Sequence, residues 1–401
     1  MGKLIKTAAV ALSIMTVLVC CAKGSDEELH NTTMSIGTIG EVPSEGISEG
    51  RFAITLTDRG NNEVKAMPDG TVVTAAAFDE STSEIVFSVS ENTGMSRSGY
   101  IVLSCGKAAE VAKIEQHQGT ILRGKSGWYE LPVITDSENH IYYSHSSLPS
   151  APERRNYSFC FATDMYASLW VAYPLHECYL GSADRRNTFG YDRDFADFCG
   201  DSGYGMQAQV TGAYYTEFGN TTTSATNLQY SRGHQLPSAD RTGSSADNDT
   251  SFYSTNMTPQ RQSLNGGAWY KLEELVRKQW ICSDTLYVVT GAMFEEGHAT
   301  AYDNKSNGKC VPVPTKYWKV LLRTRDGNTG RSVAECSASE LQCIGFVLEH
   351  SDSRSSQKVY TTDARSVKQM EELTGFTFFA NVPNAPKETF DTSLWSGLTV
   401  Q

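Results

Sequence analysis

The residue types that could carry out chemistry are concentrated in one stretch of the chain. It reads SRGHQLP at 231–237, NMTPQ at 256–260 and NGGAWYKLE at 265–273. An imidazole titrates near neutral pH, so His234 can take a proton from water. The neighbouring Arg232 offers a fixed positive charge to phosphate oxygens, and the amides and carboxylates downstream can hold a hard divalent cation. These are the parts required for metal-assisted hydrolysis of a phosphodiester.

Asn265 is the candidate metal ligand. It stands where an amphipathic helix is expected to begin, because Trp269, Leu272, Leu275 and Val276 share one helical face. A neutral amide oxygen would hold Mg²⁺ or Mn²⁺ weakly and leave the ion several waters and room for phosphate oxygens. An asparagine at the start of a helix is also a common cap, and the two roles are compatible.

These three pieces, in this order, resemble the active-site signature of the sugar-non-specific DNA/RNA endonucleases, a branch of the ββα-metal (His-Me finger) nucleases. In that family the pattern reads DRGH, then NxxPQ, then NxGxWxxLE. The resemblance extends over residues 125–390. It implies an α+β domain with an antiparallel sheet and few helices. It also implies metal-dependent hydrolysis of DNA and RNA with little sequence preference.

The resemblance assigns a role to individual residues of the signature. His234 is the general base, and Asn265 holds the metal because it follows the first Asn of the signature with the family's spacing. Asn256, that first Asn, orders the loop or the base. Glu273 lies about two helical turns beyond Asn265 and accepts hydrogen bonds from metal-bound water.

The resemblance also requires arginines that stabilise the charge of the transition state. Arg232 is one of them. For the second, upstream arginine, Arg186 followed by Asn187 matches the family best, and Arg185 is the alternative. The sequence departs from the family at Ser231, where an Asp is usual. A neutral hydrogen bond from this serine predicts weaker tuning of its neighbour and not a loss of catalysis.

Apolar runs on both sides of this stretch predict the sheet that positions it. Strands are expected at 157–161, 168–175, 285–291, 317–322 and 343–348. A short helix is expected at 366–375, where Gly375 stops it. Together with the resemblance, these elements assign residues 123–401 to the endonuclease domain.

Residues 36–120 predict a separate, small β-sandwich, because short apolar runs alternate with turn signals. The predicted strands are 52–56, 71–74, 85–89, 100–103 and 111–114. The segment 90–97 and the closing strand resemble a BACON domain, although the usual Trp before the central strand is absent. The resemblance implies a glycan- or mucin-contacting module or a structural stalk, and we favour the stalk.

The N-terminus has the pattern of an export signal. Residues 1–20 have a charged start and an apolar core too short for an ordinary membrane span. The core ends in a sequence that resembles a lipobox, with Cys21 as the lipidated residue and Cys20 as the alternative. A tether at 21–35 follows, with an acidic cluster at 26–28. The resemblance implies an outer-membrane lipoprotein exposed at the cell surface, with a plain secreted protein as the alternative.

Cysteine use fits an exported protein, since export favours disulfides. Beyond the lipobox, one cysteine, Cys105, lies before residue 150. The others lie after it: Cys160, Cys178, Cys199, Cys282, Cys310, Cys336 and Cys343. We therefore expect a disulfide framework in the C-terminal domain, with its pairing left open.

The net charge of −12 argues against a broad basic surface, which is the usual mark of a nucleic-acid binder. An acidic enzyme can still cut nucleic acid if its positive charge is local to the cleft. Two other classes of function stay open. One is a non-catalytic surface protein that binds glycan or nucleic acid on a nuclease-like scaffold. The other is a phosphodiesterase acting on small or lipid-linked substrates.

Overall fold

The computed structural model describes residues 31–92, 96–117, 127–135, 137, 139–208, 215–218, 225–302 and 309–401. The predicted signal peptide and lipid anchor lie outside these residues. The chain divides into two compact units, 1–92 with 96–118 and 93–95 with 119–401. No helix in the described ranges is long and apolar enough to cross a membrane.

The N-terminal unit consists of two antiparallel sheets packed around one core. The first has the order β1 (Thr33–Ile36), β2 (Ile47–Thr57), β5 (Glu84–Val89) and β4 (Val73–Asp79); the second has the order β3 (Val64–Pro68), β6 (Arg97–Cys105) and β7 (Ala108–Gln116). Buried residues of both sheets, such as Phe52 and Ile101, form a single cluster. The prediction of an all-β N-terminal unit is confirmed.

Two strands of this unit were not expected from the sequence. β1 begins inside the segment predicted as a tether. β3 reads VKAMP, in which only Val64 is buried. A strand with so little apolar alternation, ending in a proline, lacks the period-two signal that identified the others.

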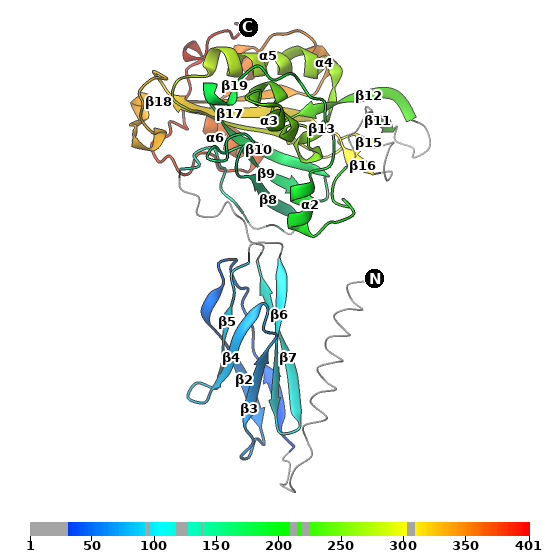
Figure 1. Ribbon diagram of the computed structural model, residues 1–401, viewed down its shortest axis with the longest axis vertical. Coiled ribbons are helices and arrows are strands. Elements are labelled where there is room, and N and C mark those ends of the chain that lie inside the picture. The colour runs from blue at the N-terminus through cyan, green and yellow to red at the C-terminus, as the bar shows by residue number, and fades with distance from the viewer. Residues whose placement is uncertain are drawn as a thin grey trace. The chain divides into compact units, whose positions relative to one another are not determined.

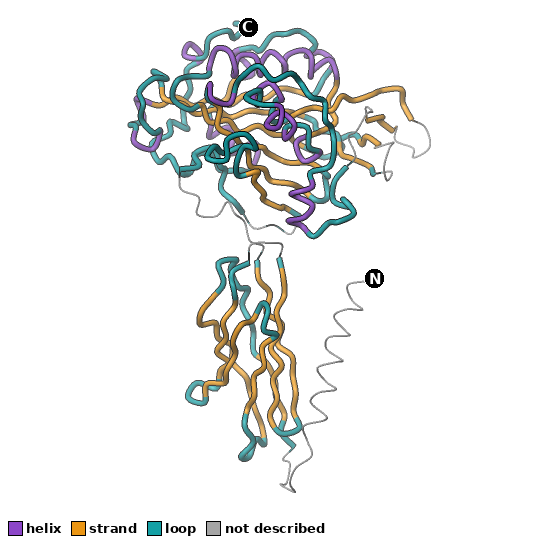
Figure 2. The backbone as a smooth tube through the Cα atoms, in the orientation of Figure 1, coloured by secondary structure: helices purple, strands orange, loops and turns teal. Residues whose placement is uncertain are grey.

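The C-terminal unit is built on a seven-stranded antiparallel sheet. Its order is β19 (Ala364–Arg365), β18 (Leu341–Glu349), β17 (Lys316–Thr324), β14 (Leu286–Met293), β10 (Ala167–Leu175), β9 (Tyr157–Ala162) and β8 (His140–His145). The five runs predicted as strands are β9, β10, β14, β17 and β18. Long loops connect the elements (Figure 2). The predicted α+β class with antiparallel sheet and few helices is confirmed.

Both faces of this sheet are buried, which explains why its strands are almost continuously apolar. Val171 and Leu321 belong to a core with the helical segment around Trp269, on one face. Their neighbours Trp170 and Val320 pack with Met370 of α6 (Val367–Thr374), on the other. Side chains of a strand alternate between faces, so each strand must be apolar on both sides. As predicted, α6 ends at Gly375, which has a φ of 75°.

A second sheet carries the signature sequence. It has the order β13 (Met257–Arg261), β12 (Ala225–His234), β11 (Tyr215–Phe218), β15 (Thr300–Tyr302) and β16 (Cys310–Pro312). After β13 the chain enters a helical segment that is kinked at Gly267 and is drawn above β13 in Figure 1. It consists of α4 (Gln262–Leu264), η4 (Asn265–Trp269), α5 (Tyr270–Leu275) and η5 (Val276–Trp280). β12, β13 and this segment form a strand–strand–helix unit.

Short helices fix the loops around these sheets. They are η1 (Glu177–Tyr179), α2 (Arg193–Cys199), η2 (Ser238–Asp240), α3 (Ser245–Thr250), η3 (Ser254–Asn256), η6 (Val333–Glu335), η7 (Ala338–Glu340), η8 (Asp352–Arg354), η9 (Thr361–Asp363) and η10 (Thr392–Leu394). In the sequence, η2, α3 and η3 form the connection from β12 to β13 within the strand–strand–helix unit.

The expected disulfide framework is not found. The eight cysteines among the described residues are all free thiols. Cys160, Cys336 and Cys343 are buried in the apolar core, where a thiol packs as a small hydrophobic group. Burial raises the pKa of Cys160 to about 12, which disfavours the reactive thiolate. Two large apolar cores lie in the C-terminal unit.

Candidate active site

The pairing of β12 with β13 fixes His234 at the end of its strand. In this antiparallel pair His234 lies opposite Met257, and Gly233 lies opposite Thr258. A Cβ atom on Gly233 would come within 2.6 Å of the Cβ of Gln260. Only a glycine therefore allows the strands to approach so closely, which explains the Gly that precedes the histidine in the signature.

The ring of His234 is buried and has one free nitrogen. It is 8% exposed, and its Nε2 has no hydrogen-bond partner. The ring does form a hydrogen bond with the backbone of Arg232. Because Nε2 has no partner among the described residues, we assign this contact to Nδ1 as the donor to the backbone oxygen. The resulting tautomer leaves an unshared electron pair on Nε2.

The surroundings of His234 keep the ring neutral. The ring of Phe252 stands at 90° to it with centroids 5.0 Å apart, and Phe189 lies 5.9 Å away. Burial, with added repulsion from Arg185 and Arg232, lowers the pKa of His234 to about 3. An imidazole in this environment is unprotonated near neutral pH and can accept a proton.

Two arginines flank this ring. The guanidinium carbon of Arg232 lies 3.6 Å from the ring centre of Phe189. Arg185 donates from Nη1 to Ser238 Oγ at 2.8 Å and lies 5.0 Å from the ring centre of Phe252. Besides burial, repulsion from both guanidinium groups lowers the pKa of His234, so both belong to the electrostatic surroundings of this ring.

Arg186, the arginine that best matched the family pattern, points elsewhere. Its Nε lies 3.2 Å from Asp249 Oδ1, and its backbone N–H donates to Asn248 at 3.1 Å. Neighbouring side chains of this non-helical loop point to different sides. The structure therefore brings Arg185, the alternative, to His234 and ties Arg186 to Asp249.

Asn256 is completely buried and links two loops. Its Oδ1 accepts from the backbone N–H of Leu236 at 2.8 Å, and its Nδ2 donates to the carbonyls of Leu236 at 2.9 Å and Ser251 at 2.7 Å. Leu236 is two residues beyond His234. Asn256 thus holds the backbone that leaves the histidine, as its predicted ordering role requires.

Asn265 lies inside the helical segment and does not cap it. The segment begins three residues earlier, at Gln262, and Asn265 has a helical φ of −57° and ψ of −45°. The predicted starting point was therefore wrong, but the predicted apolar face, from Trp269 to Val276, is buried. Within the described part of the chain the Asn265 side chain makes no hydrogen bond, so its amide oxygen can bind a cation.

A backbone kink follows Asn265. Gly267 has a φ of −102° and a ψ of −119°, and a Cβ atom there would come within 2.2 Å of the carbonyl oxygen of Arg354. This close approach requires glycine. It accounts for the Gly of the family signature two residues after the metal-ligating Asn, and it sets where Asn265 points.

Glu273 shares its surroundings with a buried lysine that sequence reasoning missed. Lys319 of β17 is completely buried. Its Nζ lies 3.1 Å from Thr290 Oγ1 and 4.4 Å from the ring centre of Trp269. Burial raises the pKa of Glu273, and the Lys319 ammonium opposes that rise. The sequence did contain a signal for this buried lysine, because Lys319 lies within the apolar run YWKVLL at 317–322.

Two further polar contacts support the signature helix. Arg277, one turn beyond Glu273, pairs with the buried Asp240 at 2.8 Å, and Tyr173 donates to the same carboxylate at 3.0 Å. Ser231 donates to Gln262 Oε1. The serine that replaces the family's Asp therefore connects the strand of His234 to the start of the helix of Asn265.

The described residues contain no group of three or more His, Cys, Asp or Glu side chains that could hold a metal. A site built on one amide oxygen suits a magnesium-like ion, which keeps much of its water shell and takes remaining ligands from a phosphate. The residues present fit such an ion. They do not fit a structural zinc site, which needs four nitrogen or sulfur ligands.

Comparison with known proteins places this site in a family. Residues 137–385 match the sequence model of the DNA/RNA non-specific endonucleases. A nuclease of Nostoc is 28% identical over 232 residues, which cover 58% of this chain and 74% of that protein. Human mitochondrial endonuclease G is 30% identical over 188 residues, 45% of this chain and 57% of that protein.

Two further comparisons are shorter or weaker. A Serratia marcescens nuclease is 37% identical over 97 residues, which cover 24% of this chain and 35% of that protein. The crystal structure of an EndoG/EndoGI complex aligns over 59% of this chain and 87% of the matched chain, with 19% identity and a TM-score of 0.37. The family match, by contrast, spans more than half of the 401 residues. The chain belongs to the DNA/RNA non-specific endonuclease family, whose members hydrolyse nucleic acids.

Proposed function

We propose that the C-terminal unit is a magnesium-dependent endonuclease that cleaves DNA and RNA with little sequence preference. The observation that carries this proposal is the state of His234. Its Nε2 is buried and has no hydrogen-bond partner among the described residues, and two guanidinium groups, of Arg185 and Arg232, favour the neutral ring. Such an imidazole can accept a proton, and the positive charge of the two arginines attracts a phosphate to it.

In this mechanism His234 removes a proton from the attacking water, and Arg185 and Arg232 stabilise the charge that develops on the phosphate oxygens. An incoming phosphate adds negative charge beside the ring. It therefore offsets the two guanidinium groups and raises the pKa of His234 toward the value that a base requires. Cleavage of the bond to the 3′ oxygen leaves a 5′-phosphate.

Asn265 would hold the metal ion through its amide oxygen, and Glu273 would accept hydrogen bonds from water at the site. When bound, Mg²⁺ or Mn²⁺ neutralises charge on the phosphate and on the leaving oxygen. Burial raises the pKa of Glu273 to about 7, and the Lys319 ammonium opposes part of that rise. Lys319 thus favours the ionised form of Glu273, which is the form that accepts those hydrogen bonds.

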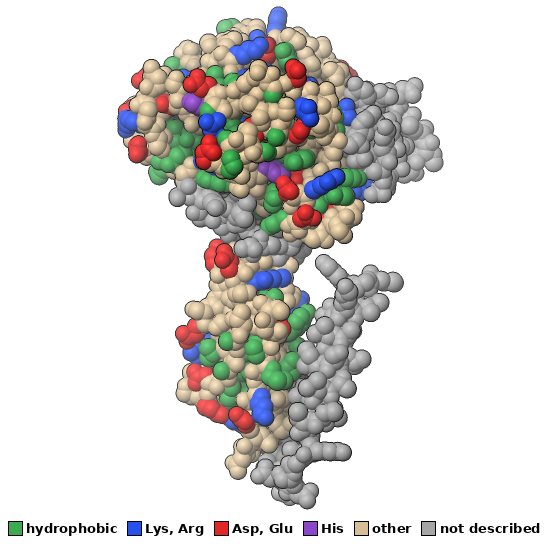
Figure 3. Space-filling view, viewed as in Figure 1, with side chains coloured by type: hydrophobic (Ala, Val, Ile, Leu, Met, Phe, Trp, Pro, Cys, Tyr) green, Lys and Arg blue, Asp and Glu red, His purple; other side chains and the backbone are tan. Residues whose placement is uncertain are grey.

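The low sequence preference follows from the distribution of charge. On the face drawn in Figure 3, Lys and Arg side chains of the C-terminal unit are interspersed with Asp and Glu. With a net charge of −12, the enzyme must gain its affinity from a few phosphate contacts near His234, and phosphates carry no base identity.

We further propose that the enzyme acts at the outer surface of the cell, attached through a lipid on Cys21 or Cys20. The N-terminal sandwich, with its resemblance to BACON domains, then serves as a spacer or contacts glycan. This arrangement would suit clearance of extracellular DNA or scavenging of nucleotides.

The function is tested by incubating the purified protein with supercoiled plasmid and with single-stranded RNA. We expect both to be cut in Mg²⁺ or Mn²⁺ and to be protected by chelator. A folded protein that cuts neither with either metal would support the non-catalytic scaffold. Cleavage of a small diester such as bis(p-nitrophenyl) phosphate, with both polymers left intact, would support the phosphodiesterase instead.

Adjacent arginines provide a matched test of the phosphate contact. We expect Arg185→Ala to lower kcat/KM for plasmid cleavage by ~10²-fold, the range for losing one donor to a developing oxyanion. Arg186→Ala should stay close to the wild type, since its charge is paired with Asp249. Initial rates at one salt concentration decide between them. A larger loss for Arg186→Ala would show that Arg186 is the arginine that contacts phosphate.

A further inference from the structure

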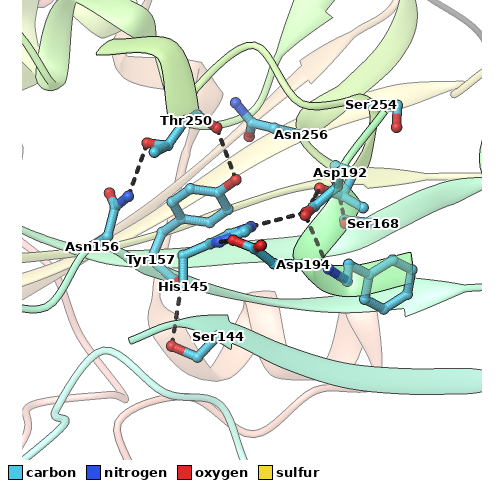
Figure 4. Close-up of polar contacts among 12 residues, drawn as sticks. Ser144, His145, Asn156, Tyr157, Ser168, Asp192, Asp194, Thr250, Ser254 and Asn256 are labelled. Carbon is cyan, nitrogen blue, oxygen red and sulfur yellow. Dashed lines mark hydrogen bonds and ion pairs between the residues drawn. The ribbon is translucent and has the colours of Figure 1, made fainter. Parts of the chain in front are cut away.

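The loop that carries Asn256 is held from beneath by a polar network that the mechanism does not use. The loop is the segment 250–256, which runs from the last residue of α3 through η3 to the start of β13. Figure 4 shows its residues Thr250, Ser254 and Asn256 above a group of side chains that includes His145 and Asp192. These side chains come from β8, β9, β10 and the start of α2, which are distant in sequence from the signature.

Asp192 is the centre of this network. It is completely buried, and its carboxylate accepts three hydrogen bonds: from His145 Nε2 at 2.8 Å, from Thr255 Oγ1 at 2.7 Å and from the backbone N–H of Phe195 at 3.1 Å. A buried carboxylate is stable only when its oxygens are satisfied in this way. The His145 ring is also buried, packed beside the rings of Tyr157 and Tyr253.

Ser254 is held to the same place. Its backbone N–H donates to the carbonyl of Gly190 at 2.8 Å, and its hydroxyl donates to Gln207 Oε1. The Gln207 side chain is in turn fixed by the backbone of Asp192, with both hydrogen bonds 2.8 Å long. Two consecutive residues of the loop, Ser254 and Thr255, are therefore attached to Asp192 and its neighbours.

Other contacts fix the remaining backbone of the loop. The Tyr157 hydroxyl donates to the carbonyl of Thr250 at 3.0 Å, and Asn156 donates to Thr250 Oγ1 at 2.8 Å. Ser168 Oγ donates to the carbonyl of Thr255 at 2.5 Å. The loop is thus oriented by specific hydrogen bonds at both ends.

This network leads directly to the base. Thr255 precedes Asn256, which holds the backbone of Leu236 just beyond His234. Phe189, three residues before Asp192, packs against His234 and lies under Arg232. A displacement at Asp192 would therefore reach His234 by two routes, through Asn256 and through Phe189.

We propose that His145 and Asp192 are positioning residues for the general base, acting through Thr255 and Asn256. The inference rests on the function proposed above. A buried ionic or polar pair adds little net stability compared with apolar side chains of similar volume. The contribution of this pair is directional: it fixes the loop 250–256 and so the orientation of His234.

The test separates the hydrogen bond of His145 from its packing. His145→Phe keeps an aromatic ring among the tyrosines but removes the donor, whereas His145→Gln keeps an amide N–H within reach of Asp192. We expect His145→Phe to lower kcat by ~10- to 100-fold, the scale of a small misplacement of a catalytic group, with KM unchanged. His145→Gln should recover much of the loss.

Ser144→Ala is the matched control. Ser144 precedes His145 on β8, and its hydroxyl contacts only β9, at the carbonyl of Tyr157 and the hydroxyl of Ser158. We expect its kcat to match the wild type. If Ser144→Ala loses as much activity as His145→Phe, the effect comes from general disturbance of the sheet, and the proposal is wrong.

A double-mutant cycle with Asn256→Ala tests the route. If His145 acts through Asn256, the two losses in kcat will not add, whereas independent effects add. Additive losses, or an unchanged kcat in His145→Phe, would overturn the inference. Should His145→Phe fail to fold, Asp192→Asn is measured in its place. A wild-type kcat in Asp192→Asn would also overturn the inference. An inactive wild-type protein would contradict the proposed function instead.

Discussion

His234→Ala is expected to fold like the wild type and to lose ~10²- to 10⁴-fold in the rate of plasmid cleavage, the range for removing a positioned acid–base group. The reason is the Nε2 of His234, which has no hydrogen-bond partner in the part of the chain that the structure describes. The substitution also removes a buried polar atom that is unsatisfied, so part of the stability lost with the ring is regained. Circular dichroism and initial cleavage rates at saturating Mg²⁺ measure the two effects separately.

His298→Ala is the control for this variant. His298 is half-buried, and its ring contacts the neighbouring carbonyl of Ala299, at 3.1 Å, and the ring of Phe294, with centroids 6.3 Å apart. Its removal should change neither the fold nor the rate. A folded His234→Ala protein that cleaves plasmid at nearly the wild-type rate would show that the base is another group.

In the seven-stranded sheet, the strands that were predicted correctly are buried on both faces. β10, β14 and β17 are long apolar runs because cores cover the sheet on either side. β12 was not predicted, although it carries His234. Its residues Ser231, Arg232 and Gly233 belong to the signature, and Gly233 allows a close approach to β13. They therefore lack the alternation of apolar and polar residues that identifies an ordinary strand.

The signature gave the order of the site residues but not the directions of side chains in loops. Arg185 and Arg186 are adjacent and chemically identical, and only the fold shows that Arg186 is taken by Asp249. His145 and Asp192 are separated by 47 positions. No periodicity connects residues on an edge strand and a helix cap, so their contact appears only after the chain has folded.

The absent disulfides have a different cause. The number of cysteines and the predicted export suggested cross-links, but four of the eight described cysteines are buried core side chains: Cys105, Cys160, Cys336 and Cys343. Cys160 and Cys343 sit on β9 and β18 with completely buried neighbours such as Trp170 and Val320. Sequence spacing cannot distinguish a buried thiol from half of a disulfide, because the distinction depends on which strands become neighbours.

Asn265→Ala is expected to lose at least ~10²-fold in cleavage and to require more Mg²⁺ for half-maximal rate. Loss of a group that only supports a metal ligand already costs up to ~100-fold. The fold should survive, because Asn265 lies within a helical segment that begins at Gln262 and alanine is the best helix former. Asn265→Asp keeps an oxygen and adds a charge, so it should retain part of the activity with an altered preference between Mg²⁺ and Mn²⁺.

The measurement is the initial rate as a function of each metal, with Gly266→Ala as the control. Gly266 is the exposed neighbour of Asn265, and the nearest atom to an added Cβ is the flexible end of the Gln262 side chain, 3.2 Å away. Its metal curve should match the wild type. If Asn265→Ala also leaves the metal curve unchanged while the rate falls, Asn265 positions substrate or helix and the ion is bound by other groups. If Asn265→Asp raises the apparent affinity for metal as the rate falls, the amide is the direct ligand, because only a coordinating oxygen would transmit the added charge to the ion so strongly.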